Sequence, residues 1–313
     1  KQSMVADIEA LPVEHSKRNR SAGGKSNVEG IIFATNTSAI PIEDIAAKAK
    51  HPERIVGMHY FSPVEKMPLL EVVKGRNTAD WVTATATKFG QRQGKTVIVV
   101  NDGPGFYTTR ILSPYVNEAM RLVTEGVPIE EVDKALLDFG FPIGPIALMD
   151  EVGLDIGAHI SETLSKALGS RHEALPELTR ILADGRKGKK NKKGFYLYDN
   201  KKKAKNRQVD ESIYTLLGLF PEPDKVPANQ IVRRCVYAML NEAAFCLKEK
   251  ILRSPRDGDI GAIFGLGFPA YTGGPFRYMD ALGIGDLGTE LEQFTKRYGN
   301  RFKPCTRLGF TRS

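Results

Sequence analysis

Two residues of this chain have the types and the spacing of a general base and its orienting partner. His59 lies in the apolar segment Gly57–Pro63, and Glu71 follows twelve residues later as the carboxylate of the apolar segment 69–73. A neutral imidazole accepts protons near neutral pH, and a carboxylate bound to its other nitrogen fixes the tautomer and stabilises the imidazolium. The pattern therefore predicts a catalytic pair on two neighbouring strands, with an ordinary polar pair at the strand ends as the alternative.

The other four histidines are less suited to this role. His15 lies in a polar segment, His51 precedes a proline at a helix end, His159 falls in a helical run and His172 lies in a predicted loop. We expect each of them to be incidental to the chemistry.

Length and composition indicate a globular protein of two or three domains. The chain has 313 residues, and its cysteines, Cys235, Cys246 and Cys305, form no C-x-x-C pair, which predicts reduced thiols and no metal site. No apolar run reaches the roughly 18 residues that span a bilayer, and no signal peptide is evident. The chain starts at Lys1, and we expect it to be a piece of a longer protein with any targeting segment upstream.

The basic charge suits a polyanionic partner. The formal net charge is +8, and much of it lies in residues 185–194 and 201–205. Nucleic acid, a membrane surface or a phosphate-bearing cofactor would each match this charge, and a solvated loop is the simpler alternative.

The first third of the chain alternates strand and helix patterns. The apolar segments predict strands at 31–34, 54–61, 69–74 and 96–100. The amphipathic segments between them predict helices at 41–50 and 80–93. This β-α-β-β-α-β order predicts half of a nucleotide-binding sheet. Ser38 and His59 fall at the carboxyl ends of strands, where such sheets bind ligands, so we expect both residues and Glu71 on one rim.

Helical periodicity replaces the strands after a turn-rich hinge near Gly103. The helical part contains a repeat, in which Asn117–Ala119 recurs as Asn241–Ala243 and Gly140–Pro142 recurs as Gly267–Pro269. We predict two copies of one helical unit packed as an internal pseudo-dimer. The predicted domains are residues 1–103, 104–215 and 216–313.

Several motifs together resemble the 3-hydroxyacyl-CoA dehydrogenase family. They are Ala34–Ser38, Gly57–Pro63, Leu70–Val72, Asp102–Phe106, Gly140–Pro145 and Lys193–Tyr196, in the order and spacing of that family. The resemblance is highly specific and runs from about residue 30 to about residue 308. It implies a partial Rossmann-like α/β domain followed by a duplicated all-α C-terminal domain, and the second helical copy resembles the multifunctional fatty-acid oxidation members.

The resemblance implies an activity and a set of site residues. The activity is NAD-dependent oxidation of 3-hydroxyacyl-CoA, of long chain length, to 3-ketoacyl-CoA. His59 would take the proton from the 3-hydroxyl, Glu71 would orient His59, and Ser38 would bind the reacting oxygen. Asn36 and Ser62 match positions on the nicotinamide side of the NAD pocket, although Ser62 stands where the family commonly has asparagine.

Substrate contacts are predicted further along the chain. Thr109 stands where the short dehydrogenases have an asparagine close to the thioester, so its role is either substrate binding or helix-start packing. Lys189 and Lys190 lie in the basic loop, and we expect them to hold the phosphates of CoA.

The Thr108-Thr109-Arg110 form of the motif resembles the multifunctional members that work in a trifunctional complex. That resemblance implies an acyl-CoA substrate, a thiolase subunit as partner, association with an inner-membrane surface, and a mitochondrial location. It implies no nucleic-acid partner.

One expected motif is missing. A dinucleotide site uses G-x-G-x-x-G after the first strand, and no such motif precedes Gly30, while residues 12–29 form an atypical insert. By the resemblance, we expect the first half of the sheet and an upstream hydratase domain to be missing from this chain. A catalytically inactive module for acyl-CoA binding or subunit assembly is the alternative function, and nucleic-acid binding through the lysines is the weakest.

Overall fold

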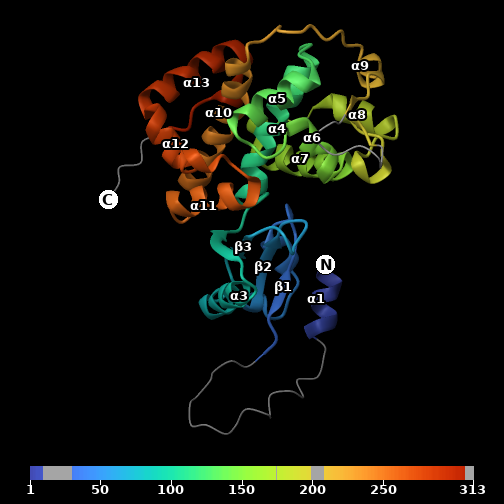
Figure 1. The fold of residues 1–313 in the computed structure, drawn as a ribbon. Coiled ribbons are helices and arrows are strands. Elements are labelled where there is room, and N and C mark those ends of the chain that lie inside the picture. The colour runs from blue at the N-terminus through green and yellow to red at the C-terminus, as the bar shows by residue number, and fades with distance from the viewer. Residues whose placement is uncertain (10–29, 174, 199–207, 307–313) are drawn as a thin grey trace.

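The computed structural model describes residues 1–9, 30–173, 175–198 and 208–306, so the insert 12–29 and the lysines at 201–205 lie outside the described residues. Figure 1 shows a smaller lobe built on a β-sheet and a larger lobe of helices. The α/β-then-helical fold class predicted from the sequence is confirmed. No helix in the described part of the chain is long and apolar enough to cross a membrane.

The sheet has four described strands in sequence order, and it is mixed rather than parallel throughout. The strands are β1 (Phe33–Thr35), β2 (Ile55–Tyr60), β3 (Leu69–Lys74) and β4 (Thr96–Asn101). The β1–β2 and β3–β4 pairs are parallel, whereas β2 and β3 run antiparallel. The helices of this lobe are α1 (Gln2–Glu9), α2 (Ile42–Ala46) and α3 (Asp80–Arg92).

The first strand is the least accurate prediction in this lobe. It was expected to cover residues 31–34 and to be buried on both faces, but β1 covers Phe33–Thr35, Ile31 is 50% exposed and Ala34 is exposed. The physical reason is its place in the sheet, because β1 pairs with β2 on one side and is the edge of the described strands. The predicted helix at 41–50 is likewise shorter, at Ile42–Ala46.

Strand alternation decides what each face of the sheet buries. On one face Val56 and Met58 of β2 and Val72 of β3 pack in a cluster with Val82 of α3. The opposite face carries the residues between them and joins the core of the helical lobe. His59 and Glu71 belong by alternation to this second face, so the pair points toward the helices.

The helical lobe consists of two similar series of helices. The first series is α4 (Thr108–Thr124), α5 (Ile129–Phe139), α6 (Pro145–Val152), α7 (Leu154–Leu168) and the 3₁₀ turn η3 (Gly169–His172). The second is α10 (Ala228–Lys248), α11 (Pro255–Leu266), α12 (Pro275–Leu282), α13 (Ile284–Tyr298) and η7 (Asn300–Phe302). Between them lie α8 (Pro176–Ala183), η4 (Lys189–Asn191), α9 (Ser212–Leu217) and a hairpin of β5 (Tyr196–Leu197) and β6 (Gln208–Val209).

Buried ion pairs between the two series are reciprocal. Arg110 Nε on α4 donates to Glu242 on α10 over 2.7 Å, and Arg234 Nη2 on α10 donates to Glu118 on α4 over 3.0 Å. All four side chains are buried. Arg110 and Arg234 are equivalent residues of the two copies, and so are Glu118 and Glu242. The arginine of each copy therefore pairs with the glutamate of the other copy, which is the pattern of a two-fold interface. The repeat predicted from sequence thus packs as a pseudo-dimer.

Equivalent aspartates also shape the two series. Asp133 accepts backbone hydrogen bonds from Ile146 and Ala147 at the start of α6, and Asp259 accepts one from Phe276 at the start of α12. A carboxylate at a helix N-terminus satisfies amides that lack partners inside the helix. The same local device therefore starts the corresponding helix in each copy.

Candidate active site

His59 and Glu71 lie directly opposite each other on β2 and β3. His59 Nδ1 is 2.6 Å from Glu71 Oε2, and the side chains are only 5% and 0% exposed. A carboxylate accepts hydrogen bonds, so the proton on the ring lies on Nδ1 and the other nitrogen, Nε2, is left to accept one. The structure thus brings together the two residues that the sequence predicted as a pair.

Thr108 completes the surroundings of Glu71 and was not predicted. Its backbone amide donates to Glu71 Oε1 over 3.0 Å, and its hydroxyl donates to Oε2 over 2.9 Å. Thr108 is the first residue of α4, where the helix dipole also favours a carboxylate. Glu71 is therefore fixed through both oxygens by one residue of the helical lobe.

Two aromatic rings enclose the imidazole. The Phe61 ring centroid is 4.6 Å from that of His59, and the Phe106 centroid is 5.9 Å away. Phe106 is fully buried and has a positive φ of 49°, which is uncommon for a residue other than glycine. Apolar rings at these distances exclude water, and interactions between charges are stronger where water is excluded.

The residues predicted for the reacting oxygen and the nicotinamide lie on neighbouring loops. Asn36 follows β1, and its side-chain oxygen accepts a hydrogen bond from the Tyr60 amide over 3.1 Å, next to His59 in the chain. Ser38 and Ser62 are exposed on the loops after β1 and β2. Among the described residues, no hydrogen bond joins Ser38 or Ser62 to His59, so their roles stay predictions.

The loop that carries Ser38 is held from the domain hinge. Asp102 accepts hydrogen bonds from the Ile42 and Glu43 amides, each over 2.8 Å, at the start of α2. Burial raises the pKa of Asp102, and these backbone donors offset part of that effect. Asp102 was noted only as part of a motif, and its capping role depends on a contact between residues that are far apart in sequence.

Thr109 lies at an apolar cavity of about 80 Å³ between α4, α6 and α7. The side chain is half-buried, and the neighbouring residue Thr108 is the one that binds Glu71. The wall is formed mainly by aliphatic side chains, including Leu112, Val116 and Leu148. Substrate binding and helix-start packing both stay predictions for Thr109.

The lysines predicted to bind CoA phosphates already have acidic partners. Lys189 Nζ is 2.8 Å from Glu151 Oε2, and Lys190 pairs with Asp155. These pairs are exposed, and such pairs contribute only about 0–1 kcal/mol, so a phosphate could displace either carboxylate. Phosphate binding by Lys189 and Lys190 stays a prediction.

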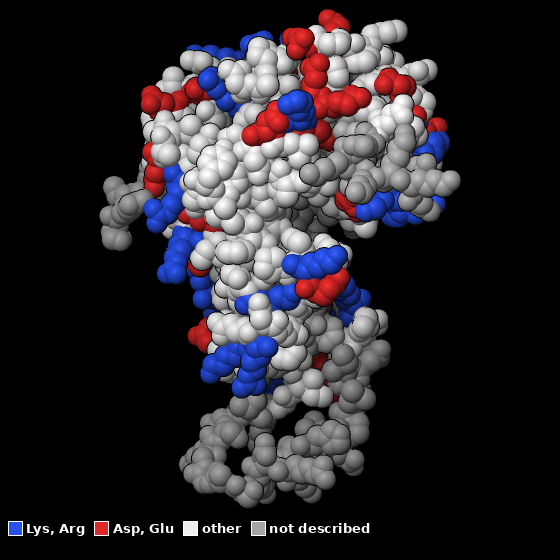
Figure 2. Space-filling model, in the orientation of Figure 1, with Lys and Arg blue, Asp and Glu red and all other residues white. Residues whose placement is uncertain are grey.

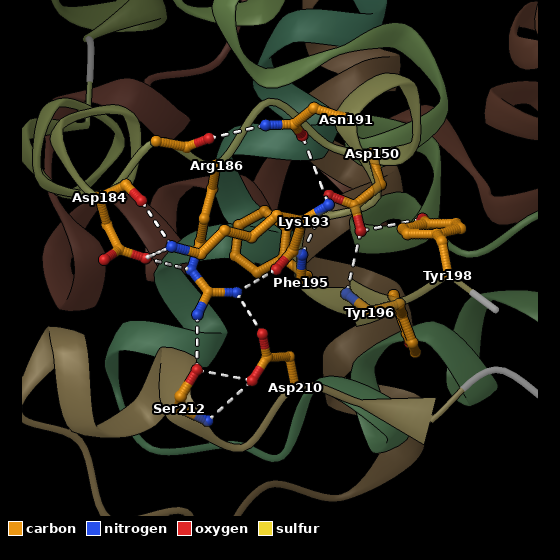
Figure 3. A network of polar contacts seen from close by, with 12 residues as sticks. Asp150, Asp184, Arg186, Asn191, Lys193, Phe195, Tyr196, Tyr198, Asp210 and Ser212 are labelled. Carbon is orange, nitrogen blue, oxygen red and sulfur yellow. Dashed lines mark hydrogen bonds and ion pairs between the residues drawn. The ribbon is translucent and has the colours of Figure 1, made fainter.

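The basic loop itself is a structural element (Figure 3). Arg186 is buried and donates to Asp184, Asp210, Ser212 and the Gly194 carbonyl. Asp150 of α6 accepts hydrogen bonds from the amides of residues 195 and 196, each over 3.0 Å. This network fixes the backbone of the loop to α6. On the face in Figure 2, basic and acidic side chains are interspersed over the helical lobe, whereas Lys and Arg predominate on the sheet lobe.

His172 was expected to be an incidental loop residue, and it lies instead in η3 at the centre of the helical lobe. Its side chain is fully buried, with Nδ1 3.2 Å from Ser113 Oγ and Nε2 3.3 Å from Glu242. It belongs to the ion-pair network between the two copies. In the part of the chain that the structure describes, no cluster of His, Cys, Asp or Glu could hold a metal ion.

A buried His–carboxylate pair on the two inner strands of the described sheet, facing an all-helical lobe, is the arrangement of a dehydrogenase with separate nucleotide and substrate domains. Residues 20–103 match the family model for the NAD binding domain of 3-hydroxyacyl-CoA dehydrogenase, and residues 105–198 match the model for its C-terminal domain. The chain belongs to the 3-hydroxyacyl-CoA dehydrogenase family.

Known proteins similar to this chain agree with that assignment. The fatty acid oxidation complex subunit alpha of Idiomarina loihiensis is 52% identical over 308 residues, which are 98% of this chain and 41% of the relative. The subunit of the same name from Vibrio parahaemolyticus is 54% identical over the same shares. The chain therefore spans well under half the length of the curated relatives that it matches.

Two solved structures share the fold. A 3-hydroxybutyryl-CoA dehydrogenase from Escherichia coli superposes with a TM-score of 0.73 at 26% identity, covering 88% of this chain and 74% of that one. The dehydrogenase part of multifunctional enzyme 1 from C. elegans gives a TM-score of 0.61 at 25% identity, covering 88% of this chain and 64% of that one.

The mitochondrial location expected from the sequence is wrong. The relatives that match nearly the whole chain at 52–54% identity are bacterial proteins. The Thr108-Thr109-Arg110 motif on which that expectation rested is too short to outweigh a match over 308 residues.

Proposed function

We propose that this chain oxidises 3-hydroxyacyl-CoA to 3-ketoacyl-CoA in fatty-acid oxidation, as part of a longer protein. The observation that carries the proposal is the buried contact of His59 with Glu71, whose two oxygens are both bound by Thr108. This arrangement leaves one ring nitrogen free to take a proton and holds the ring in one orientation.

The proposed chemistry removes a proton and a hydride from the substrate. His59 Nε2 takes the proton of the 3-hydroxyl group, and the buried carboxylate of Glu71 stabilises the imidazolium that forms. Bound NAD supplies the hydride acceptor for the hydrogen on C3. The exposed Ser38 hydroxyl would donate a hydrogen bond to the reacting oxygen, and the aromatic rings of Phe61 and Phe106 would keep water from the base.

The residues present fit only the nicotinamide end of the cofactor. Asn36 and Ser62 lie on the loops that follow β1 and β2, beside the strand that carries His59. No G-x-G-x-x-G loop that could bind the pyrophosphate precedes Gly30, and β1 is the edge of the described sheet. We therefore propose that strands from elsewhere complete the NAD site.

The proposal also includes the limits of the domains and the partners of the chain. We propose residues 1–103 as the partial NAD-binding domain, and 104–215 and 216–313 as the two helical copies. The relatives carry the name of a complex subunit, which supports association with other subunits. A thiolase subunit and a membrane surface are the partners that we propose from the sequence resemblance alone. The alternative, an inactive module for acyl-CoA binding or subunit assembly, is favoured by the missing pyrophosphate loop.

Turnover separates these two functions. The chain is incubated with NAD and a 3-hydroxyacyl-CoA, and NADH absorbance is followed alongside calorimetric titration of the acyl-CoA. An enzyme produces NADH in proportion to the 3-ketoacyl-CoA formed. Binding of acyl-CoA without NADH, at saturating NAD and in the longer protein as well, would support the inactive module and contradict the proposal.

A further inference from the structure

The helix α11, which belongs to the second helical copy, lies on the side of the helical lobe that faces the sheet (Figure 1). Its residues Gly261 and Gly265 are buried and four positions apart, so they share one face of the helix. A Cβ atom at Gly261 would be 2.7 Å from Ile98 Cδ1 of β4, and one at Gly265 would be 2.5 Å from Leu69 Cδ2 of β3. Carbon atoms in contact are ordinarily about 3.5–4.0 Å apart. Glycine at both positions therefore lets the helix backbone come this close to the two strands.

The same face of α11 reaches the groups that surround the catalytic pair. The Cβ position at Gly265 is 3.3 Å from Thr108 Cγ2 and 3.5 Å from the ring of Phe61. Thr108 binds both oxygens of Glu71, and the ring of Phe61 packs against the imidazole of His59. Gly265 thus contacts one neighbour of each member of the pair.

The second copy also holds both ends of the hinge between the two lobes. The backbone amide of Asn101 donates to the Ile251 carbonyl over 2.9 Å, and its side chain donates to the Lys250 carbonyl over 2.6 Å. Tyr107 is fully buried, and its hydroxyl donates to the Gly258 carbonyl of α11 over 3.0 Å. The start of α4, which follows the hinge directly, is thereby fixed relative to the sheet.

The first copy shows that this contact does not come from the helical fold itself. Gly140 and Gly267 are equivalent in the repeat, and they directly follow α5 and α11. Six and two positions earlier, α5 has Lys134 and Asp138 where α11 has its two buried glycines. Lys134 and Asp138 are exposed and pair with each other. A charged, exposed face in one copy is therefore a buried glycine face in the other.

We propose that Gly261 and Gly265 are positioning residues for the dehydrogenase reaction, supplied by the helical copy that contains neither member of the catalytic pair. By letting α11 contact the two strands, they set how closely the start of α4 approaches Glu71, and through Thr108 they fix the orientation of His59. The inference rests on the proposed function, because it takes His59 as the base. The second copy then affects turnover through packing, without a group that touches the substrate.

The test adds one methyl group at each glycine in the longer protein that contains this chain. Gly261→Ala and Gly265→Ala each place a Cβ against a buried side chain of the sheet. Alanine favours a helix more than glycine does, so both variants should fold, with α11 displaced from the strands. Gly285→Ala is the matched control, because Gly285 is exposed on α13 and its added Cβ meets no atom within 4 Å.

Turnover should report the displacement as a change in kcat. A misplacement of a catalytic group by about 1 Å can cost roughly 10²-fold in rate. We expect Gly265→Ala to lower kcat by about 10–100-fold and to leave the KM for acyl-CoA within about twofold, because the base acts in the transition state. Gly261→Ala should change kcat in the same direction, and Gly285→Ala should match the wild type.

A second substitution separates positioning from a general loss of stability. Leu69→Val removes the Cδ2 atom that the new Cβ at Gly265 would meet. The double variant Gly265→Ala with Leu69→Val should therefore recover most of the lost kcat. If Gly265→Ala only destabilised the fold, a further core truncation would add to the damage instead of relieving it.

A spectroscopic measurement needs neither NAD nor turnover. The proton on His59 Nδ1, which Glu71 Oε2 accepts over 2.6 Å, should give a far-downfield proton resonance in protein labelled with isotopic histidine. Its absence from His59→Gln assigns it. We expect this resonance to move upfield in Gly265→Ala, to stay in place in Gly285→Ala, and to return in the double variant.

Wild-type kcat in both alanine variants, or a His59 resonance that does not move in Gly265→Ala, would overturn the proposal. A kcat that Leu69→Val lowers further in the Gly265→Ala background would also overturn it, since it would show a loss of stability alone. A wild-type protein that forms no NADH would contradict the proposed function, and the His59 resonance would then decide the positioning role by itself.

Discussion

Glu71 Oε2 accepts hydrogen bonds from two groups on different lobes, His59 Nδ1 at 2.6 Å and the Thr108 hydroxyl at 2.9 Å. One carboxylate oxygen thus joins the sheet lobe, which carries the base, to the first residue of α4. Orientation of the base consequently depends on how the helical lobe is docked.

We predict that Thr108→Val lowers kcat by about tenfold with little change in the KM for acyl-CoA. Valine keeps the shape and the backbone amide but removes the hydroxyl donor, so Glu71 loses one of its constraints, and a lost hydrogen bond to a charged group is worth about 1.5–3 kcal/mol. Thr108→Ser retains the hydroxyl and should stay near wild type. A Thr108→Val enzyme with unchanged kcat would show that the amide alone positions Glu71.

We predict that Arg110→Met reduces the free energy of unfolding by about 3–5 kcal/mol, because it leaves Glu242 buried without its nearest partner. Urea unfolding measures the change. Lys134→Met is the control, since it breaks an exposed pair with Asp138 and should cost less than about 1 kcal/mol. Similar losses in both variants would contradict the structural role given to the reciprocal pairs.

Stability should depend on pH through Asp133. Burial raises the pKa of Asp133 from its ordinary value of 3.8 to about 6, so the folded protein favours the protonated carboxyl. Its contribution is fully present below pH about 4 and is lost as the pH rises through about 6. From pH 4 to 7, the free energy of unfolding should therefore fall by about 3 kcal/mol more in the wild type than in Asp133→Asn. Parallel pH curves for the two proteins would contradict this.

The basic loop can be tested by its salt dependence. Replacing Lys189, Lys190 and Lys192 together by glutamine should raise the KM for acyl-CoA and flatten the dependence of KM on ionic strength. Lys166→Gln, which breaks an exposed pair with Glu162 on α7, should change neither. If the triple variant keeps the KM and the salt slope of the wild type, the loop serves structure or another surface.

The catalytic pair could be predicted from sequence because it depends on local pattern. A single polar residue in each of two apolar strands separated by a short loop leaves few pairings, and His59 and Glu71 are indeed register partners. Thr108 could not be predicted in the same way, because its contact with Glu71 requires knowing where α4 docks. The partners of Lys189 and Lys190 lie 38 and 35 residues away, on helices whose packing no periodicity specifies.

The repeat was visible in sequence, whereas its consequences were not. Matching Asn117 with Asn241 predicted two packed copies. The ion pairs that Arg110 and Arg234 each form with a glutamate of the other copy could be found only in the structure. The bounds and exposure of β1 could not be predicted, because an apolar run does not reveal that its strand lies at the edge of the described sheet.

The most direct test of the account is the kcat of His59→Gln in the longer protein that contains this chain, at saturating NAD and acyl-CoA. Glutamine cannot accept the proton in the transition state, so kcat should fall by roughly 10²–10⁴-fold while acyl-CoA affinity changes little. His159→Gln, at an exposed position on α7, should retain wild-type turnover. A His59→Gln enzyme with kcat near that of the wild type would contradict the assignment of His59 as the base.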